Sequence, residues 1–161
     1  MNIDVMPTLI DQFRETFEGE VTKGMVWITD GPPDSAVFGL LDSLTPDDAL
    51  AAPAPGVKSI AQHAAHLRFS LDLMAERLQG ANPPADWPGS FRLTDASADG
   101  WAALKRDLRR AYDAVIAILQ TMRSSAVQDV EPIKVAGLAA MTGHNAYHLG
   151  AMRQLARIVR G

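Results

Sequence analysis

The residues with the clearest capacity for chemistry are four histidines, which fall into two pairs. The first pair is His63 and His66, and the second pair is His144 and His148. Side chains three or four residues apart lie on the same face of an α-helix. If both segments are helical, each pair presents two imidazoles on one face. Neutral imidazole is a good ligand for zinc, nickel, copper and iron.

The pattern around each pair predicts that the imidazoles point into a helical core. Apolar residues continue the spacing of the second pair in one stripe, through Met141, Met152 and Leu155. Such a stripe marks the buried face of an amphipathic helix. In the first segment we expect the solvent side to be formed by Ala61, Ala65, Arg68, Asp72 and Gln79. His63, His66 and Ser70 fall on the opposite side.

Buried imidazoles favour a metal because both ring nitrogens need partners. An unpaired polar group in a core costs about 1–3 kcal/mol. A divalent ion takes one lone pair from each neutral ring and leaves the other N–H for a second acceptor. Three imidazoles also leave one position on the ion open, as in catalytic sites. The residues alone leave another interpretation open, in which the histidines are satisfied core residues of a helical interaction module without metal.

Composition narrows the classes of function. The chain has no cysteine, so disulfides, thiolate metal sites and a cysteine nucleophile are excluded. The net charge is −4, and a local group of basic residues, Lys105 to Arg110, is interpreted as a solvated helix face, so we expect no nucleic acid partner. Residues 1–4 lack the features of a secretory signal, and no run reaches the roughly 20 apolar residues of a membrane helix. We therefore expect a cytoplasmic protein that does not bind membranes.

Helical periodicity, interrupted by proline- and glycine-rich segments that end helices, predicts an all-α fold. We expect four long helices in one domain, residues 1–161. The first helix is expected from Pro7 to about Trp27 or Ile28, and the second from the N-cap Ser59 to Gly80, with Gln62 as capping-box partner. The third is expected at 97–122 and the fourth at 133–158, after a connection at 124–132. Short helical pieces are expected at 34–44 and after Thr45, and residues 81–96 form a linker.

Two motifs resemble the DinB-like (DinB/YfiT) superfamily of bacterial metalloenzymes. The segment Ser59-Ile60-Ala61-Gln62-His63-Ala64-Ala65-His66-Leu67 resembles the opening of the family's second helix. The segment from His144 to Leu155 resembles the family's closing H-x-x-x-H signature, followed by a glycine and a basic residue. The resemblance implies an antiparallel four-helix bundle, here with extra short helices in the first connection. It also implies that His66, His144 and His148 are the metal ligands.

The resemblance further implies a function. Similar proteins include thiol-dependent S-transferases and a mycothiol-dependent maleylpyruvate isomerase, so the first hypothesis is an enzyme that uses zinc or nickel to activate a low-molecular-weight thiol, or water, against a small electrophile. His63, where relatives have an apolar residue, is the candidate catalytic proton acceptor. Its alternative roles are direct ligation of the metal as a fourth ligand and support of a ligand from the surrounding layer of residues. Tyr147 and Arg77 are candidate substrate contacts. Ala151 departs from the glutamine that many relatives have.

Three further expectations accompany this hypothesis. The alternative function is a non-catalytic metal-binding or stress-response bundle protein. Related bundles often form homodimers, and the segment around Trp87 together with Val37, Phe38 and Leu41 is a candidate contact surface. The metal site requires that His66 lies within about 8 Å of His144 and His148, because bonds from imidazole to metal are about 2 Å long.

Overall fold

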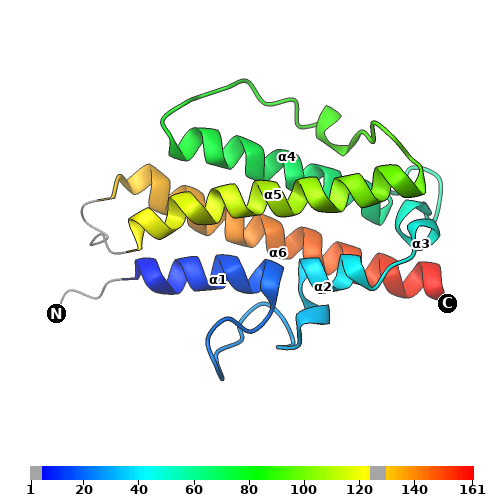
Figure 1. The fold of residues 1–161 in the computed structure, drawn as a ribbon, viewed down its shortest axis with the longest axis horizontal. Helices are drawn as coiled ribbons and strands as arrows, with labels where there is room; N and C mark the ends of the chain where they lie inside the picture. Colours follow the sequence, from blue (N-terminus) through cyan, green and yellow to red (C-terminus); the bar gives the residue numbers. More distant parts are fainter. Residues whose placement is uncertain (1–4, 124–129) are drawn as a thin grey trace. The chain divides into compact units, whose positions relative to one another are not determined.

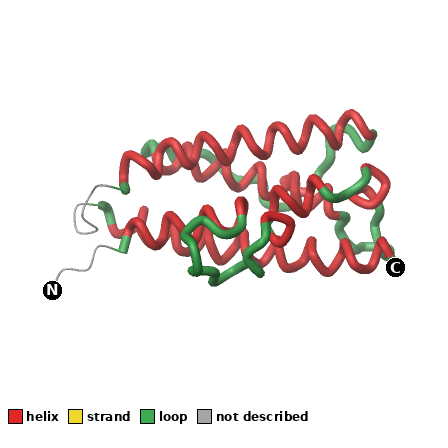
Figure 2. The backbone as a smooth tube through the Cα atoms, turned by 60° about the horizontal axis from the view of Figure 1, so that its bottom comes forward, coloured by secondary structure: helices red, strands yellow, loops and turns green. Residues whose placement is uncertain are grey.

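The computed structural model describes residues 5–123 and 130–161, in which helices are joined by loops and no strand is present (Figure 2). The predicted all-α class is confirmed. The α-helices, labelled in Figure 1, are α1 (Met6–Glu18), α2 (Val37–Asp42), α3 (Pro46–Leu50), α4 (Ile60–Leu78), α5 (Ala98–Met122) and α6 (Pro132–Arg160). Two 3-10 turns are η1 (Pro33–Ser35) and η2 (Gly89–Phe91). The antiparallel packing of the long helices stays a prediction.

The helices are distributed over two compact units. The first unit comprises Met1–Asp42 and Ile116–Leu149, and the second comprises Ser43–Val115 and Gly150–Gly161. Helices α5 and α6 are each divided between the two units, with one part in each. The expectation for residues 1–4, and most of the expected connection after α5, concern residues outside the described ranges.

The first unit has an aromatic core that joins α1 to α2. The ring centroids of Phe13 and Phe17 are 5.6 Å apart, and those of Phe17 and Phe38 are 5.5 Å apart. Val37 and Leu41 are buried beside them. The prediction that Val37, Phe38 and Leu41 form a contact surface is therefore wrong, because their apolar side chains are already covered within this unit.

Helix α1 ends at Glu18, about nine residues before the predicted end. Gly19 has φ of +89°, which takes the chain out of the helix. A Cβ at Gly19 would lie 3.0 Å from the carbonyl oxygen of Gly31, so this close approach also requires glycine. The prediction of a helix to Trp27 or Ile28 is wrong because the chain after Gly19 folds back along α1.

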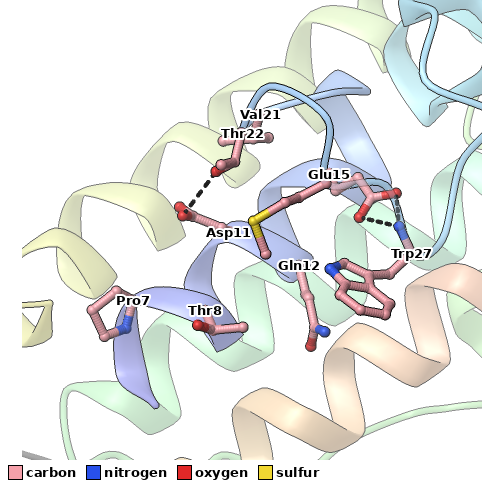
Figure 3. A pocket seen from close by; sticks show the side chains of 9 residues that line it. Pro7, Thr8, Asp11, Gln12, Glu15, Val21, Thr22 and Trp27 are labelled. Atoms are coloured by element: carbon pink, nitrogen blue, oxygen red, sulfur yellow. Dashed lines mark hydrogen bonds between the residues drawn. The ribbon is translucent and has the colours of Figure 1, made fainter. Parts of the chain in front are cut away.

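The returning loop is held by one buried carboxylate. Glu15 is 2 % exposed. Its Oε1 accepts hydrogen bonds from the backbone N–H groups of Trp27, Ile28 and Thr29 at 2.7–3.0 Å, and from the Thr29 hydroxyl at 3.1 Å (Figure 3 shows the bonds to Trp27). A single side chain thus supplies the acceptors that a continued helix would have provided for these N–H groups.

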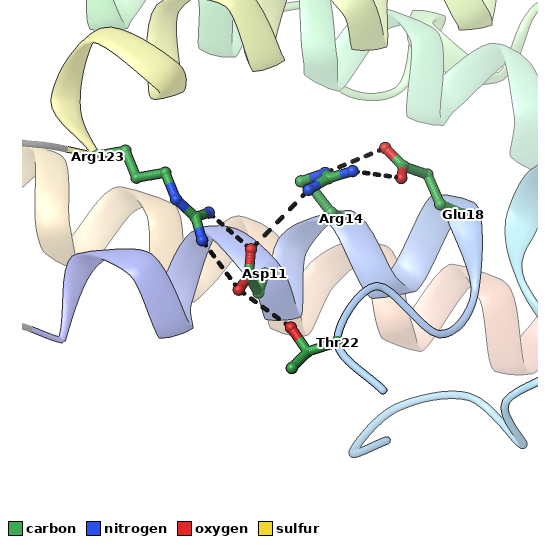
Figure 4. A network of polar contacts seen from close by, with 5 residues as sticks. All are labelled: Asp11, Arg14, Glu18, Thr22 and Arg123. Atoms are coloured by element: carbon green, nitrogen blue, oxygen red, sulfur yellow. Dashed lines mark hydrogen bonds and ion pairs between the residues drawn. The ribbon is translucent and has the colours of Figure 1, made fainter. Parts of the chain in front are cut away.

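A second polar network connects the end of α5 to α1. Arg123 donates to both carboxylate oxygens of Asp11, at 2.7 and 3.2 Å, and the Thr22 hydroxyl donates to the same carboxylate at 3.3 Å (Figure 4). The hydrogen bonds from Arg123 hold the pKa of Asp11 below its ordinary value. Arg14 extends the network through a pair with Glu18 at 2.8 Å.

In the second unit, the predicted starts of α3 and α4 are confirmed. The Ser59 side chain accepts from the N–H of Gln62 and the Gln62 side chain accepts from the N–H of Ser59, which is a complete capping box at the start of α4. Thr45 and Asp48 form the same arrangement at the start of α3. Gly80, with φ of +92°, follows the end of α4 as predicted.

The core of the second unit is formed by apolar stripes of α4, α5 and the end of α6. Its largest buried members include Ile60, Leu67, Leu71, Trp101, Leu108, Met152 and Leu155. Ala61 and Ala65 are also buried, so their predicted place on the solvent side of α4 is wrong. Their small side chains allow close packing against neighbouring elements, and the positions of the charged residues on α4 did not indicate this. No helix in the described ranges combines the length and apolarity of a membrane span.

We predict that replacing Glu15 destabilises the protein strongly. Glu15→Ala leaves several buried or half-buried donors without an acceptor and should lower the free energy of unfolding by about 3 kcal/mol. Glu20→Ala is the matched control, because among the described residues the exposed Glu20 carboxylate accepts only the Gly24 N–H. It should cost less than about 1 kcal/mol. Urea denaturation measures both, and equal losses would contradict the assigned role of Glu15.

Candidate metal centre

Helix α4 brings His66 into the interior of the second unit. The side chain is 5 % exposed and follows Ala64 and Ala65 on a buried face. One turn later, the Ser70 hydroxyl donates to the carbonyl oxygen of His66 at 2.8 Å. The capping box at Ser59 sets where the helix begins, and therefore which face His66 occupies.

The linker between α4 and α5 surrounds the His66 ring. Phe91 stacks on it with ring centroids 4.1 Å apart and an interplanar angle of 6°. The Trp87 ring lies 5.8 Å away, and the Ser90 hydroxyl oxygen lies 2.6 Å from His66 Nδ1. The sequence predicted only a linker here and gave no indication of a role for Ser90 or Phe91.

A tight turn places these linker residues. The Asp86 carboxylate accepts the Gly89 N–H at 2.9 Å, and the Asp86 carbonyl accepts the Ser90 N–H at 3.0 Å. A Cβ at Gly89 would lie 2.0 Å from Asp86 Oδ2, so only glycine fits while this bond is kept. The Asp-Trp-Pro-Gly sequence was the available signal for the turn, but nothing in it indicates contact with a residue 24 positions earlier.

Helix α6 supplies the second pair in the first unit. The ring centroids of His144 and His148 are 4.6 Å apart at 69°. His148 is buried and His144 is partly exposed. Tyr147 lies edge-on to His148 at 5.0 Å, yet 71 % of Tyr147 is exposed. The one-turn spacing thus places both imidazoles together, as the sequence predicted.

Asn145 is a buried polar residue of this region that sequence analysis missed. It is 0 % exposed, and its Oδ1 lies 3.4 Å from Nδ1 of His144. Its amide nitrogen has no hydrogen-bond partner among the described residues. A buried N–H without an acceptor costs about 1–3 kcal/mol.

His66, His144 and His148 form a group that could hold a metal ion. One ring nitrogen of each lies within 4.8 Å of those of the other two. The geometric condition of about 8 Å is therefore met. Ligands around a tetrahedral ion with bonds near 2.1 Å are about 3.4 Å apart. Side-chain adjustments on the order of 1 Å would close the group around one ion.

The chemistry of the donor set fits a divalent transition metal. Three imidazoles, without thiolate or carboxylate in the group, suit zinc, nickel, copper or iron rather than magnesium or calcium, which prefer oxygen ligands. His63 is not a member of the group of three.

A comparison with protein families identifies the superfamily of the chain. A family model described as the DinB superfamily matches residues 35–152. The chain belongs to the DinB superfamily. The resemblance stated from the two histidine motifs is confirmed, and the matched range contains all three histidines and the linker of this DinB-superfamily chain. No curated protein and no solved structure matches it significantly.

The remaining predicted site residues lie at different places. His63 is one turn before His66 on α4, half-buried, and edge-on to Phe91 with centroids 5.8 Å apart. Arg77 is exposed in the last turn of α4. Eleven residues separate Arg77 from His66, which corresponds to about 16 Å along the helix axis. No described contact brings Arg77 to the histidines.

We predict that His63 and His144 make the metal-free protein sensitive to mild acid. Burial lowers the pKa of both below the ordinary 6.5, with Lys58 adding to the lowering at His63 and Asn145 opposing it at His144. The unfolded chain therefore binds these protons more tightly than the folded one. Stability should be complete above about pH 6.5 and fall as the pH drops through the folded-state values.

Urea midpoints measured with a chelator from pH 7.5 to 5 test this prediction. Carboxylates also titrate toward pH 5, so the informative quantity is the difference between wild type and variant. His63→Asn and His144→Asn should flatten the curve, whereas the control Tyr147→Phe should not. Parallel curves for wild type and both histidine variants would contradict it.

Proposed function

We propose that His66, His144 and His148 bind one zinc or nickel ion, and that the loaded protein activates a low-molecular-weight thiol for attack on a small electrophile. Water is the alternative nucleophile at the same position. The observation that supports this proposal most directly is the three-imidazole group. Membership of the DinB superfamily supports it as well.

The composition of the site determines what kind of chemistry is available. Neutral imidazoles leave the full charge of a divalent ion uncompensated, and three of them leave a position open. When bound there, the ion would lower the pKa of a coordinated thiol or water toward neutrality. Because the chain has no cysteine, the thiol has to belong to a cofactor or substrate.

His63 is the proposed proton acceptor. Burial lowers its pKa below 6.5, so at neutral pH the imidazole is neutral and has a lone pair that can accept a proton. It lies one turn before His66 on the same helix, which places it near the proposed ligand without belonging to the group of three. A general base within hydrogen-bond reach of the nucleophile contributes typically 10²–10⁴-fold to the rate.

Tyr147 is the better placed of the two proposed substrate contacts. Its exposed phenol lies beside His148, where it can hydrogen-bond to a ligand that approaches from solvent. Arg77 is proposed only for a long substrate, because it lies about 16 Å from His66 along α4.

Metal binding itself is the first prediction to test. The purified protein should bind about one equivalent of zinc, and His148→Ala should weaken the affinity by more than about 100-fold, since a directly coordinating imidazole matters at least as much as its outer partners. Tyr147→Phe is the matched control in the same helical turn and should bind like wild type. Competition with a chromogenic chelator measures the affinity, and unchanged binding by His148→Ala would contradict the ligand assignment.

Thiol activation is tested with the metal-loaded protein. Assayed with glutathione, mycothiol or a simple thiol and a panel of small electrophiles, the loaded wild type should consume thiol, and His63→Gln should reduce kcat/KM by about 10²-fold or more at unchanged zinc occupancy. If the loaded wild type and His144→Ala are equally inactive throughout the panel, the enzymatic proposal fails. A large fall in melting temperature on chelation would then favour a structural role for the ion.

A further inference from the structure

A relay of two hydrogen bonds runs from the linker to His66. The Ser90 hydroxyl donates to the carbonyl oxygen of Trp87, with the oxygens 2.5 Å apart. The same hydroxyl oxygen lies 2.6 Å from Nδ1 of His66. Ser90 is buried, so water does not compete freely for either bond.

Counting protons in this relay determines the tautomer of His66. Two oxygens 2.5 Å apart need a proton between them, and the Trp87 carbonyl has none to give. The single hydroxyl proton of Ser90 therefore points at Trp87. Ser90 can then offer His66 only a lone pair, so Nδ1 of His66 must carry the hydrogen.

We infer that Ser90 is a positioning residue that holds His66 in the Nδ1–H tautomer and thereby leaves the Nε2 lone pair for the metal. The value of this arrangement to the site rests on the proposed metal, but the tautomer itself does not. In a neutral imidazole one nitrogen donates and the other accepts, and the hydrogen bond of one nitrogen decides which.

The ring contacts and the hydrogen bond fix different aspects of the orientation of the imidazole. Phe91, stacked at an interplanar angle of 6°, holds the plane of the ring but accommodates either of its two flipped orientations. Only the orientation with Nδ1 toward Ser90 makes the bond at 2.6 Å. Ser90 therefore selects the flip as well as the tautomer.

The corresponding contact at His144 is longer. Its Nδ1 lies 3.4 Å from Asn145 Oδ1, against 2.6 Å for the bond between His66 and Ser90. Of these two outer partners, Ser90 makes the shorter bond and is expected to have the larger effect. Outer hydrogen-bond partners of metal-bound histidines typically contribute 10–100-fold to metal affinity.

Nitrogen-15 NMR of histidine-labelled, metal-free protein tests the tautomer directly. Near pH 7.5, wild-type His66 should show a protonated Nδ1 and an unprotonated Nε2, with the signals assigned by their loss in His66→Asn. In Ser90→Ala they should move toward averaged values, whereas Ser90→Thr, which keeps a hydroxyl, should retain the wild-type pattern. A protonated Nε2 in wild type would overturn the inference.

Zinc affinity provides the second readout. Ser90→Ala should bind zinc about 10–100-fold more weakly than wild type, and Ser90→Thr should recover most of the loss. Ser97→Ala is the matched control, because Ser97 is in the same linker and its side chain accepts the Gly100 N–H at the start of α5. Equal affinities of Ser90→Ala and wild type would overturn the positioning role.

The two proposals fail in distinguishable ways. If wild-type protein binds no zinc, the metal proposal fails, while the NMR pattern of the metal-free protein still decides the tautomer. If zinc binds tightly and Ser90→Ala changes neither readout, the inference about Ser90 fails and the metal proposal stands. Circular dichroism of Ser90→Ala and Ser97→Ala checks that both variants are folded.

Discussion

An imidazole removed from water needs a partner for each of its two nitrogens, and the surroundings of His66 follow from this requirement. Nδ1 has its partner in Ser90, at 2.6 Å, within the same unit. The turn from Asp86 to Gly89 places this hydroxyl beside the ring, and Phe91 stacks on the ring. Helix α4 supplies the histidine, but the linker decides which nitrogen remains available for a ligand.

Buried polar groups organise the first unit by the same physical rule. The Glu15 carboxylate is satisfied by three backbone N–H groups and one hydroxyl, so a charged side chain holds a loop instead of destabilising the core. The Asn145 amide differs, because its nitrogen lacks an acceptor among the described residues. The Glu15 carboxylate therefore stabilises the fold of the first unit, and the Asn145 amide nitrogen makes no comparable contribution through hydrogen bonds to the described residues.

Family membership and donor chemistry constrain function to different degrees. The DinB superfamily match indicates which residues to compare, and the three-imidazole group indicates which metals are suitable. Neither specifies the electrophile or the thiol, because a fold can carry many chemistries. Two further features of the described residues, His63 with its lowered pKa and the relay through Ser90, are therefore needed to narrow the chemistry that the site can support.

Local interactions were readable from the sequence, and distant ones were not. The starts of α3 and α4 followed from Thr45 with Asp48 and from Ser59 with Gln62, because a capping box involves residues only three positions apart. The pairing of His144 with His148 followed equally from helical geometry. The tertiary structure decided the end of α1 and the role of Ser90. Glu15 bonds a loop 12–14 residues away and Ser90 meets His66 across 24 residues, separations at which periodicity carries no information about which groups will touch.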